Sequence, residues 1–165
     1  TYLDPAHPLQ VDIADTLAEL AAEPIAAIAV DGCGAPVMAV SLAGLATAFA
    51  RLAAGDPDRP EGRIATAIRR APAYLGGTGR DVTALIEGTP GLIAKDGAEA
   101  VYAVGLADGR GIALKIADGG QRARPVVLGA VLRRLGVEST AYEVLAHAPV
   151  LGHGQPVGAV LPTDW

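Results

Sequence analysis

Lysine is rare in this chain, and its rarity marks two positions where chemistry could occur. The sequence holds 11 arginines but only two lysines, Lys95 and Lys115. Where arginine is so strongly preferred, a lysine that is present indicates a position that needs an ammonium group able to lose its proton. Desolvated ahead of Asp96, the Lys95 amine would act as a base or proton shuttle beside a hydroxyl nucleophile. The competing interpretation is a surface lysine paired with Asp96 or Glu99, and Lys115, inside a predicted strand, is expected to be structural.

A second candidate group follows a short apolar run, where Asp31 and Cys33 stand two residues apart. Side chains at strand ends are where binding sites gather. The thiol could be a nucleophile, which needs a base within reach, or a metal ligand, which needs two or three companions. The three histidines, His7, His147 and His153, are not spaced locally for zinc. Composition alone favours a third interpretation, a buried and inert thiol.

A glycine-rich segment, residues 76–79, precedes Arg80 and a predicted helix. A helix that begins there could bind an anion at its N-terminus, and Arg80 could hold a substrate carboxylate through two hydrogen bonds. The segment lacks the lysine and the spacing of a phosphate-binding P-loop. A plain turn is therefore the competing interpretation.

Hydroxyl nucleophiles are scarce. Thr1 could be an N-terminal threonine nucleophile activated by its own amine, although a trimmed chain explains it more simply. Ser41 and Ser139 are the only serines, and neither begins a Ser-x-x-Lys motif. A serine–lysine mechanism would therefore have to take its serine from outside the chain.

Hydrophobic spacing, together with capping residues, predicts the helices that must position these side chains. They are expected at residues 10–22, 42–54, 62–71, 81–87 and 125–135.

The clearest strand signal is a hairpin of residues 100–106 and 111–117, because Asp108 and Gly109 would supply the two positions of positive φ that a tight hairpin turn needs. Ile112, Leu114 and Ile116 would share one face of its second strand. Residues 25–30 predict a buried strand, and the Gly- and Pro-rich tail from 152 to 165 is expected to be irregular. The fold class is therefore α/β (α+β), a small antiparallel sheet with flanking helices.

Composition narrows the classes of function. The 165 residues are 51% hydrophobic but only 4% aromatic, which indicates one domain with a core of Ala, Leu, Val and Ile. The net charge of −5 argues against nucleic acid as a partner. No apolar run of membrane-spanning length and no signal-peptide pattern is present, which argues against a membrane partner. The single cysteine points to a reducing compartment, so a cytoplasmic location is expected.

Several blocks that occur in a fixed order resemble the L-asparaginase II family. They are residues 4–10 (DPAHPLQ), 31–36 (DGCGAP), 41–46 (SLAGLA), 91–99 (GLIAKDGAE) and 111–119 (GIALKIADG). The resemblance covers about residues 1–136. It implies a fold like that of serine β-lactamases and glutaminases, and hydrolysis of L-asparagine to aspartate and ammonia by serine–lysine pairs.

The resemblance also implies roles for individual residues. Lys95 matches the family's catalytic lysine in the block Lys95-Asp96-Gly97. Cys33 matches a cysteine ligand of a zinc ion near the substrate, and Asp31 matches a polar group beside that site. The remaining zinc ligands, a second cysteine and a lysine, would come from an upstream segment. Zinc is thus the expected cofactor, and it would orient the substrate.

The chain also departs from the family pattern. It begins after the Ser-x-x-Lys motif, the second serine and the Cys-Ser-Gly-Lys-His block, so residues 1–165 are expected to be one domain, the C-terminal half of a larger catalytic domain. Asp96 replaces the usual hydroxyl residue, and Ala100 stands where glycine is common. A half-domain exposes apolar surface, which predicts a homodimer or aggregation.

Two functions from different classes are compatible with these observations. The first is an asparaginase-type amidohydrolase in which Lys95 shuttles a proton, Arg80 and Asp31 bind substrate, and Cys33 helps to hold zinc. The second is a non-catalytic α/β module that binds a small ligand or a partner chain.

Overall fold

The structure is a computed structural model that describes residues 1–146 and 148–163. Its centre is a three-stranded antiparallel sheet with the strand order β3-β4-β5. The strands are β3 (Ile93–Gly97), β4 (Val101–Gly105) and β5 (Gly111–Lys115). β4 and β5 form the predicted hairpin, and Gly109 in its turn has the expected positive φ, 87°. The positive φ expected at Asp108 is wrong, because only the glycine of the pair adopts it.

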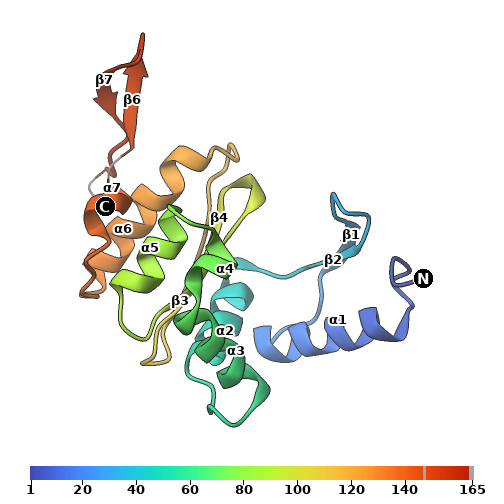
Figure 1. The fold of residues 1–165 in the computed structure, drawn as a ribbon. Coiled ribbons are helices and arrows are strands. Elements are labelled where there is room, and N and C mark those ends of the chain that lie inside the picture. Colours follow the sequence, from blue (N-terminus) through green and yellow to red (C-terminus); the bar gives the residue numbers. More distant parts are fainter. Residues whose placement is uncertain (147, 164–165) are drawn as a thin grey trace.

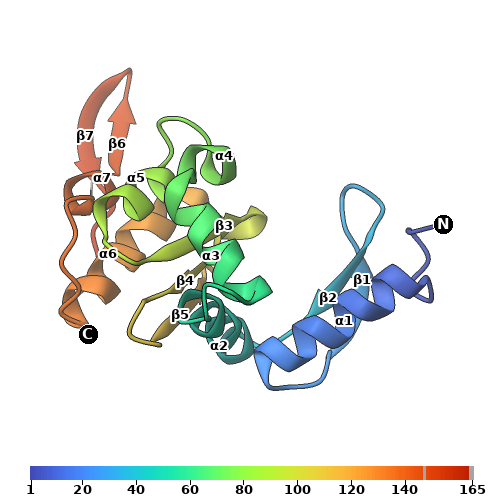
Figure 2. The same cartoon turned by 60° about the horizontal axis from the view of Figure 1, so that its bottom comes forward.

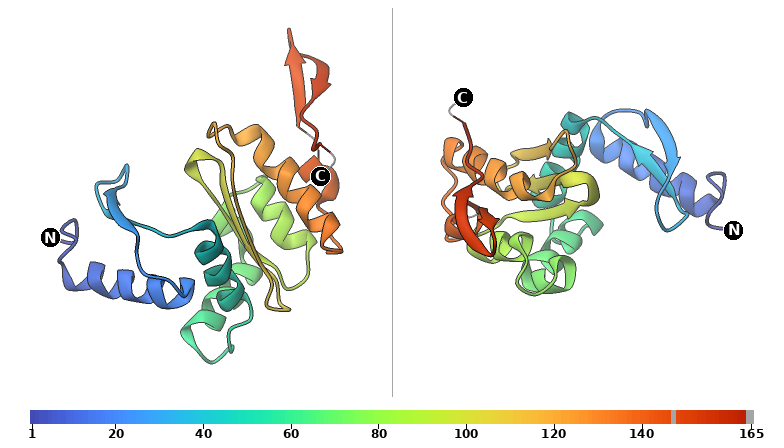
Figure 3. Two further views of the ribbon diagram at one scale, coloured as in Figure 1. Left: turned by 180° about the vertical axis from the view of Figure 1, so that it is seen from behind. Right: turned by 90° about the horizontal axis from the view of Figure 1, so that it is seen from above.

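Helices cover both faces of this sheet (Figure 1, and the left view of Figure 3). On one face lie α2 (Leu42–Ala53) and α3 (Pro60–Arg70), and on the other lie α5 (Asp81–Gly88) and α6 (Arg124–Arg134). The predicted mixed α/β class is confirmed. These four helices begin and end within two residues of the predicted limits.

Two short helices were not predicted. α4 (Pro72–Gly76) follows α3 directly, and α7 (Tyr142–Ala146) follows α6 after a loop. Pro72 ends α3, as the sequence indicated, but it also occupies the first position of the next helix, where its missing N–H costs nothing. Both helices are five residues long, too short to show a helical hydrophobic period.

The core has two parts because the sheet has two covered faces. The larger part lies between the sheet and the α5–α6 layer, and Tyr102, Leu85, Leu128 and Leu132 are fully buried in it. Ile112 belongs to the same part and Leu114 packs against it, which confirms the predicted face of the second hairpin strand. The smaller part lies between the sheet and the α2–α3 layer.

The backbone of α2 lies directly on β4 and β5. A Cβ atom at Gly105 would lie 2.0 Å from the carbonyl oxygen of Phe49, and one at Gly111 would lie 2.0 Å from that of Ala46. Any side chain at either glycine would push the helix away from the sheet. The sheet with its two helical layers, residues 42–137, is called the body below.

The N-terminal arm, residues 1–40, extends away from the body in both Figure 1 and Figure 2. It consists of α1 (Pro8–Ala21) and a hairpin of β1 (Ala27–Val30) with β2 (Pro36–Ala39). The prediction of a buried strand at residues 25–30 is wrong, because every residue of β1 is exposed. The apolar run forms a strand, but its only sheet neighbour is β2 and no core forms around it.

The tail is also more regular than predicted. β6 (Pro149–Gly152) pairs with β7 (Gln155–Ala159) in a projecting hairpin (Figure 1), whose turn places His153 and Gly154 at φ values of 50° and 77°. Two successive positive φ values are typical of the turn that joins a tight hairpin. Residues 164 and 165 of the predicted irregular tail lie outside the described residues.

Among the described residues, no helix has the length and apolarity needed to cross a lipid bilayer.

Candidate functional site

Lys95 and Arg80 meet at one carboxylate. Nζ of Lys95 donates to Oδ1 of Asp96 at 2.9 Å and to the Asp96 carbonyl oxygen at 2.6 Å. Nη2 of Arg80 donates to Oδ2 of the same carboxylate at 2.8 Å. The cations come from different elements: Lys95 lies on β3, and Arg80 is the residue that caps the start of α5. The structure therefore brings two predicted site residues together through Asp96, which the sequence suggested only as a pairing partner of Lys95 and as a departure from the family pattern.

Both cations remain open to solvent while the carboxylate beneath them does not. The side chains of Arg80 and Lys95 are 54% and 44% exposed, but that of Asp96 is 9% exposed. The expected desolvation of the Lys95 amine is thus wrong, and the competing interpretation, a surface lysine paired with Asp96, is correct. It leaves the ammonium group accessible to a ligand.

A buried arginine holds Asp96 from the other side. Nη1 of Arg124 donates to Oδ2 of Asp96 at 3.0 Å and to Oε1 of Gln121 at 2.7 Å. Nη2 of Arg124 donates to both carboxylate oxygens of Asp81, at 3.1 Å and 3.0 Å. Its guanidinium lies over the Tyr102 ring, 4.8 Å from the centroid. Sequence reasoning missed Arg124 and Asp81 as part of the site.

The position of this cluster follows from the topology of the sheet. Asp96 lies near the end of β3, opposite Tyr102 at the start of β4. Asp81 and Arg124 are the first residues of α5 and α6, so the N-termini of both helices meet the sheet at this place. Carboxylates are stabilised near helix N-termini by the helix dipole, which favours Asp81 and Asp96 here.

The charges around Asp96 keep it ionised. Burial alone would raise the pKa of Asp96, but the hydrogen bond and charge of Lys95, together with the charges of Arg124 and Arg80, outweigh burial and lower it. Burial also raises the pKa of Tyr102, and the charge of Asp81 adds to that increase, so its hydroxyl stays protonated. The Tyr102 hydroxyl and Nε of Arg124 are buried without a well-formed hydrogen bond.

The connection from β3 to β4 has an unusual backbone. Glu99 and Ala100 both have left-handed conformations, with φ values of 58° and 56°. This conformation favours glycine, which gives a physical reason why glycine is common at the position of Ala100 in the pattern that the sequence resembles. Lys115 donates to the carbonyl oxygens of Glu99 and Ile116, so it braces this connection, as expected for a structural lysine.

Asp31 and Cys33 lie elsewhere, at the tip of the β1–β2 hairpin in the N-terminal arm. Sγ of Cys33 is 3.5 Å from Oδ2 of Asp31, and both residues are exposed. The interpretation of Cys33 as a buried thiol is wrong. Within the part of the chain that the structure describes, no hydrogen bond or ion pair joins Asp31 or Cys33 to Asp96, Arg80 or Lys95.

The donors among the described residues do not make a zinc centre by themselves. Within residues 1–146 and 148–163, no group of three or more His, Cys, Asp or Glu side chains is placed to hold a metal ion. Asp31 and Cys33 supply two donors, whereas a zinc site needs at least three from protein. His147, one of the three histidines of the sequence, lies outside the described residues.

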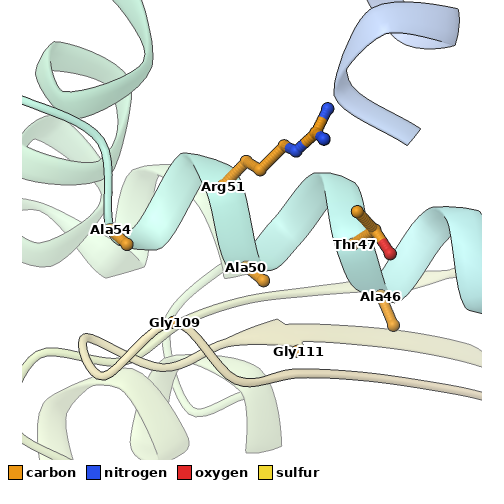
Figure 4. Close-up of a pocket in the computed structure, with 7 residues that line it drawn as sticks. All are labelled: Ala46, Thr47, Ala50, Arg51, Ala54, Gly109 and Gly111. Carbon is orange, nitrogen blue, oxygen red and sulfur yellow. The ribbon is translucent and has the colours of Figure 1, made fainter. Parts of the chain in front are cut away.

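A concave surface on the other side of the sheet is not the candidate site. A cavity of about 410 Å³ lies between α2 and the β5 side of the β4–β5 hairpin (Figure 4). Its lining is mostly alanine and glycine, and its one charged side chain, Arg51, points away along α2 and donates to the carbonyl of Glu19 in the arm. Its one hydroxyl, that of Thr47, donates to the Ala43 carbonyl, and the lining offers no histidine, lysine or carboxylate to activate it.

The fold and the Asp96 cluster define a mixed α/β protein whose candidate site is a lysine and an arginine presented at one end of an antiparallel sheet. The chain belongs to the L-asparaginase II family, whose sequence model matches residues 1–162. The match extends beyond residue 136, where the resemblance was expected to end, and includes the β6–β7 hairpin. None of the curated proteins compared with the chain matches it. Family membership supports an asparaginase-like amidohydrolase in general.

Proposed function

We propose that this chain provides Lys95 and Arg80 to an amidohydrolase that converts L-asparagine to aspartate and ammonia. One observation carries the proposal beyond the family match. Lys95 and Arg80 are 15 residues apart in sequence, yet both rest on the Asp96 carboxylate with their charged ends exposed. A proton carrier and a carboxylate ligand would thereby stand side by side.

The two cations suit different parts of asparagine. The guanidinium of Arg80 would bind the α-carboxylate, since arginine matches the two oxygens of a carboxylate with parallel N–H groups. Lys95 in its neutral form would take the proton from a nucleophilic hydroxyl as the oxygen attacks the side-chain amide carbon. It would then deliver that proton to the departing nitrogen, which leaves as ammonia. Water then hydrolyses the ester, which releases aspartate and restores the hydroxyl.

The nucleophile in this proposal comes from outside residues 1–165. Ser41 caps α2 and bonds to Glu23 in the arm, and Ser139 bonds to Thr89 and to the Ala141 amide. Neither serine contacts Lys95, so the serines that the family resemblance implies would be contributed by a segment that precedes this sequence. No step is assigned to zinc. Asp31 and Cys33 would contribute to a zinc site only if that segment completed it.

The test is steady-state ammonia release from L-asparagine by the natural protein that contains this sequence. Lys95→Ala should reduce kcat about 10²- to 10⁴-fold, the usual contribution of a general acid–base group. Lys95→Arg keeps the charge but cannot give up its proton, so it should be about as inactive. The matched control is Lys115→Arg, which keeps the cation that braces the β3–β4 connection and should leave kcat nearly unchanged. A Lys95→Ala enzyme that retains kcat within about twofold would overturn the assignment.

A binding module without activity remains the alternative, and one observation favours it. The exposed residues of the arm and of the β6–β7 hairpin include large apolar side chains such as Ile28, Val30, Leu151 and Val157. Such surfaces suit a partner chain, which includes the homodimer expected from sequence. Size-exclusion chromatography with light scattering tests the homodimer, which a monomer at micromolar concentration would exclude. Turnover of asparagine would exclude the non-catalytic function.

A further inference from the structure

Arg124 is more deeply buried than the two cations that it stands behind. Its side chain is 4% exposed, and its guanidinium spans from α6 to α5 and to β3 through its bonds to Asp81 and Asp96. Gln121 accepts a further hydrogen bond, and the Tyr102 ring lies against the planar group. Arg124 is thereby held in one orientation from four sides.

We propose that Arg124, fixed by Asp81, is a positioning residue that acts through Asp96 to set where Lys95 and Arg80 stand. The inference rests on the proposed function, because that function is what makes the position of the two cations matter. It adds two residues, Arg124 and Asp81, that touch neither the substrate nor the reacting atoms.

The pattern of bonds at Asp96 supports this role. Oδ2 accepts from both Arg124 and Arg80, and Oδ1 accepts from Lys95. A carboxylate held only by two flexible, half-exposed cations can rotate, and the cations rotate with it. The hydrogen bond from buried Arg124 restricts rotation of the Asp96 carboxylate. The charged ends of Lys95 and Arg80, which bond to that carboxylate, are restricted with it.

The cost of burying Arg124 also argues against a purely stabilising role. Burying an ion pair costs hydration free energy that the attraction between the two charges barely offsets. Well-packed apolar side chains can therefore often replace such a pair without loss of stability. Nε of Arg124 adds to that cost, because it is buried without a partner. Arg124 shares the Asp96 carboxylate with the two exposed cations, Lys95 and Arg80. A role in ordering these cations explains why a side chain that is costly to bury is present there.

The chain offers a direct measurement of lysine order, because only two lysines are present. In a uniformly ¹⁵N-labelled sample of residues 1–165 at mildly acidic pH and low temperature, the ammonium groups of Lys95 and Lys115 should give two cross-peaks. Lys95→Arg assigns them. The readouts are the ¹⁵N relaxation of each ammonium group, its rate of hydrogen exchange and its chemical shift.

In the unchanged chain the Lys95 ammonium should be ordered and slow to exchange. Arg124→Gln and Asp81→Asn should each raise its exchange rate about threefold or more and reduce its order, and should leave the Lys115 signal in place. Arg124→Lys keeps a cation opposite Asp96 and should restore part of the order. The matched control is Arg69→Lys, a partly buried arginine that bonds the carbonyls of Gly91 and Ala53 and no carboxylate. It should lower the thermal midpoint without changing either ammonium signal.

The outcomes separate the inference from the proposed function. If Arg124→Gln and Asp81→Asn change the Lys95 signal no more than Arg69→Lys does, the positioning role is wrong, whatever the enzyme does. If Arg124→Gln fails to fold, Asp81→Asn, which preserves side-chain shape, decides the question by the same readout. Ammonia release by the natural protein with Lys95→Ala tests the proposed function separately. With both correct, Asp81→Asn lowers kcat about tenfold while Lys115→Arg does not.

Discussion

The body and the N-terminal arm present their candidate site residues in opposite ways. In the body, Lys95 and Arg80 stand on Asp96, which is itself held by a buried arginine. In the arm, Asp31 and Cys33 occupy an exposed turn, and the strands that carry it pair only with each other. Both groups carried comparable motifs in the sequence, so the difference lies in what supports them.

The comparison shows that a motif is a usable site only when its side chains are ordered by neighbours from other elements. A two-stranded hairpin without a covered face is marginally stable in water. A metal or substrate that bound at the tip of the arm would have to order that tip itself, at a cost in affinity. The cluster at the end of β3 needs no such ordering.

The body and the arm should differ most in how much an added methyl group lowers the free energy of unfolding. Gly105→Ala places a methyl group within 2.0 Å of the Phe49 carbonyl and should destabilise the body by about 3 kcal/mol, because α2 cannot yield without leaving the sheet. Its counterpart in the arm is Gly32→Ala in the β1–β2 turn, where an added Cβ meets no atom within 4 Å. That change should stay within about 0.5 kcal/mol. Urea denaturation measures both, and equal effects would show that the body is not packed as tightly as described.

Substitutions in the two regions should also differ in their effect on substrate binding, by about 2 kcal/mol. Arg80→Ala removes a charge-assisted contact to the α-carboxylate and should raise KM for L-asparagine about 10- to 100-fold, with a smaller effect on kcat. Asp31→Ala in the arm should have the smaller effect of the two, since no described contact joins it to the cluster. Steady-state kinetics with the natural protein checks this. A larger effect of Asp31→Ala would mean that the tip of the arm meets the substrate and that the comparison above is wrong.

Much of the fold could be predicted because its signals are local. Caps, prolines and the Asp108-Gly109 turn lie within a few residues of what they control, and the five long helices and the β4–β5 hairpin were found from them. The exposure of β1 could not be predicted in this way. An apolar run of residues 25–30 predicts a strand, but whether that strand is buried depends on which other elements reach it.

The site was only half predictable for the same reason. Lys95 was conspicuous because lysine is rare, and Arg80 because it follows a glycine-rich turn. Arg124 lies 43 residues from Asp81 and 28 residues from Asp96, at the start of a helix where nothing local distinguishes it from the other arginines. Its role exists only once β3, α5 and α6 have come together.

Acid should have a smaller effect, on the stability that the ionised Asp96 gives to the body. The pKa of Asp96 is lowered in the folded protein, so its ionic contacts stabilise the fold at pH values above its unfolded pKa of about 3.9. That contribution is lost as the pH falls through the lower folded value. The stability difference between the unchanged chain and Asp96→Asn should therefore be greatest near neutrality and shrink below about pH 4. Thermal midpoints measured from neutral pH to about pH 3 test this. A difference that stays constant would show that Asp96 is not held in its ionised form by the cluster.

The smallest effect separates the two regions by their cooperativity. Glu99 in the body and Ala22 at the end of α1 both have left-handed backbones, with φ values of 58° and 56°. Glycine at either position should relieve about 0.5–1 kcal/mol of strain. Glu99→Gly should raise the thermal midpoint of the whole chain, because the β3–β4 connection cannot open without opening the sheet. Ala22→Gly should slow hydrogen exchange in α1 and leave that midpoint unchanged, because the arm can open while the body stays folded. A raised midpoint for Ala22→Gly would show instead that arm and body unfold together, and the exposed hairpin would then be part of one cooperative structure.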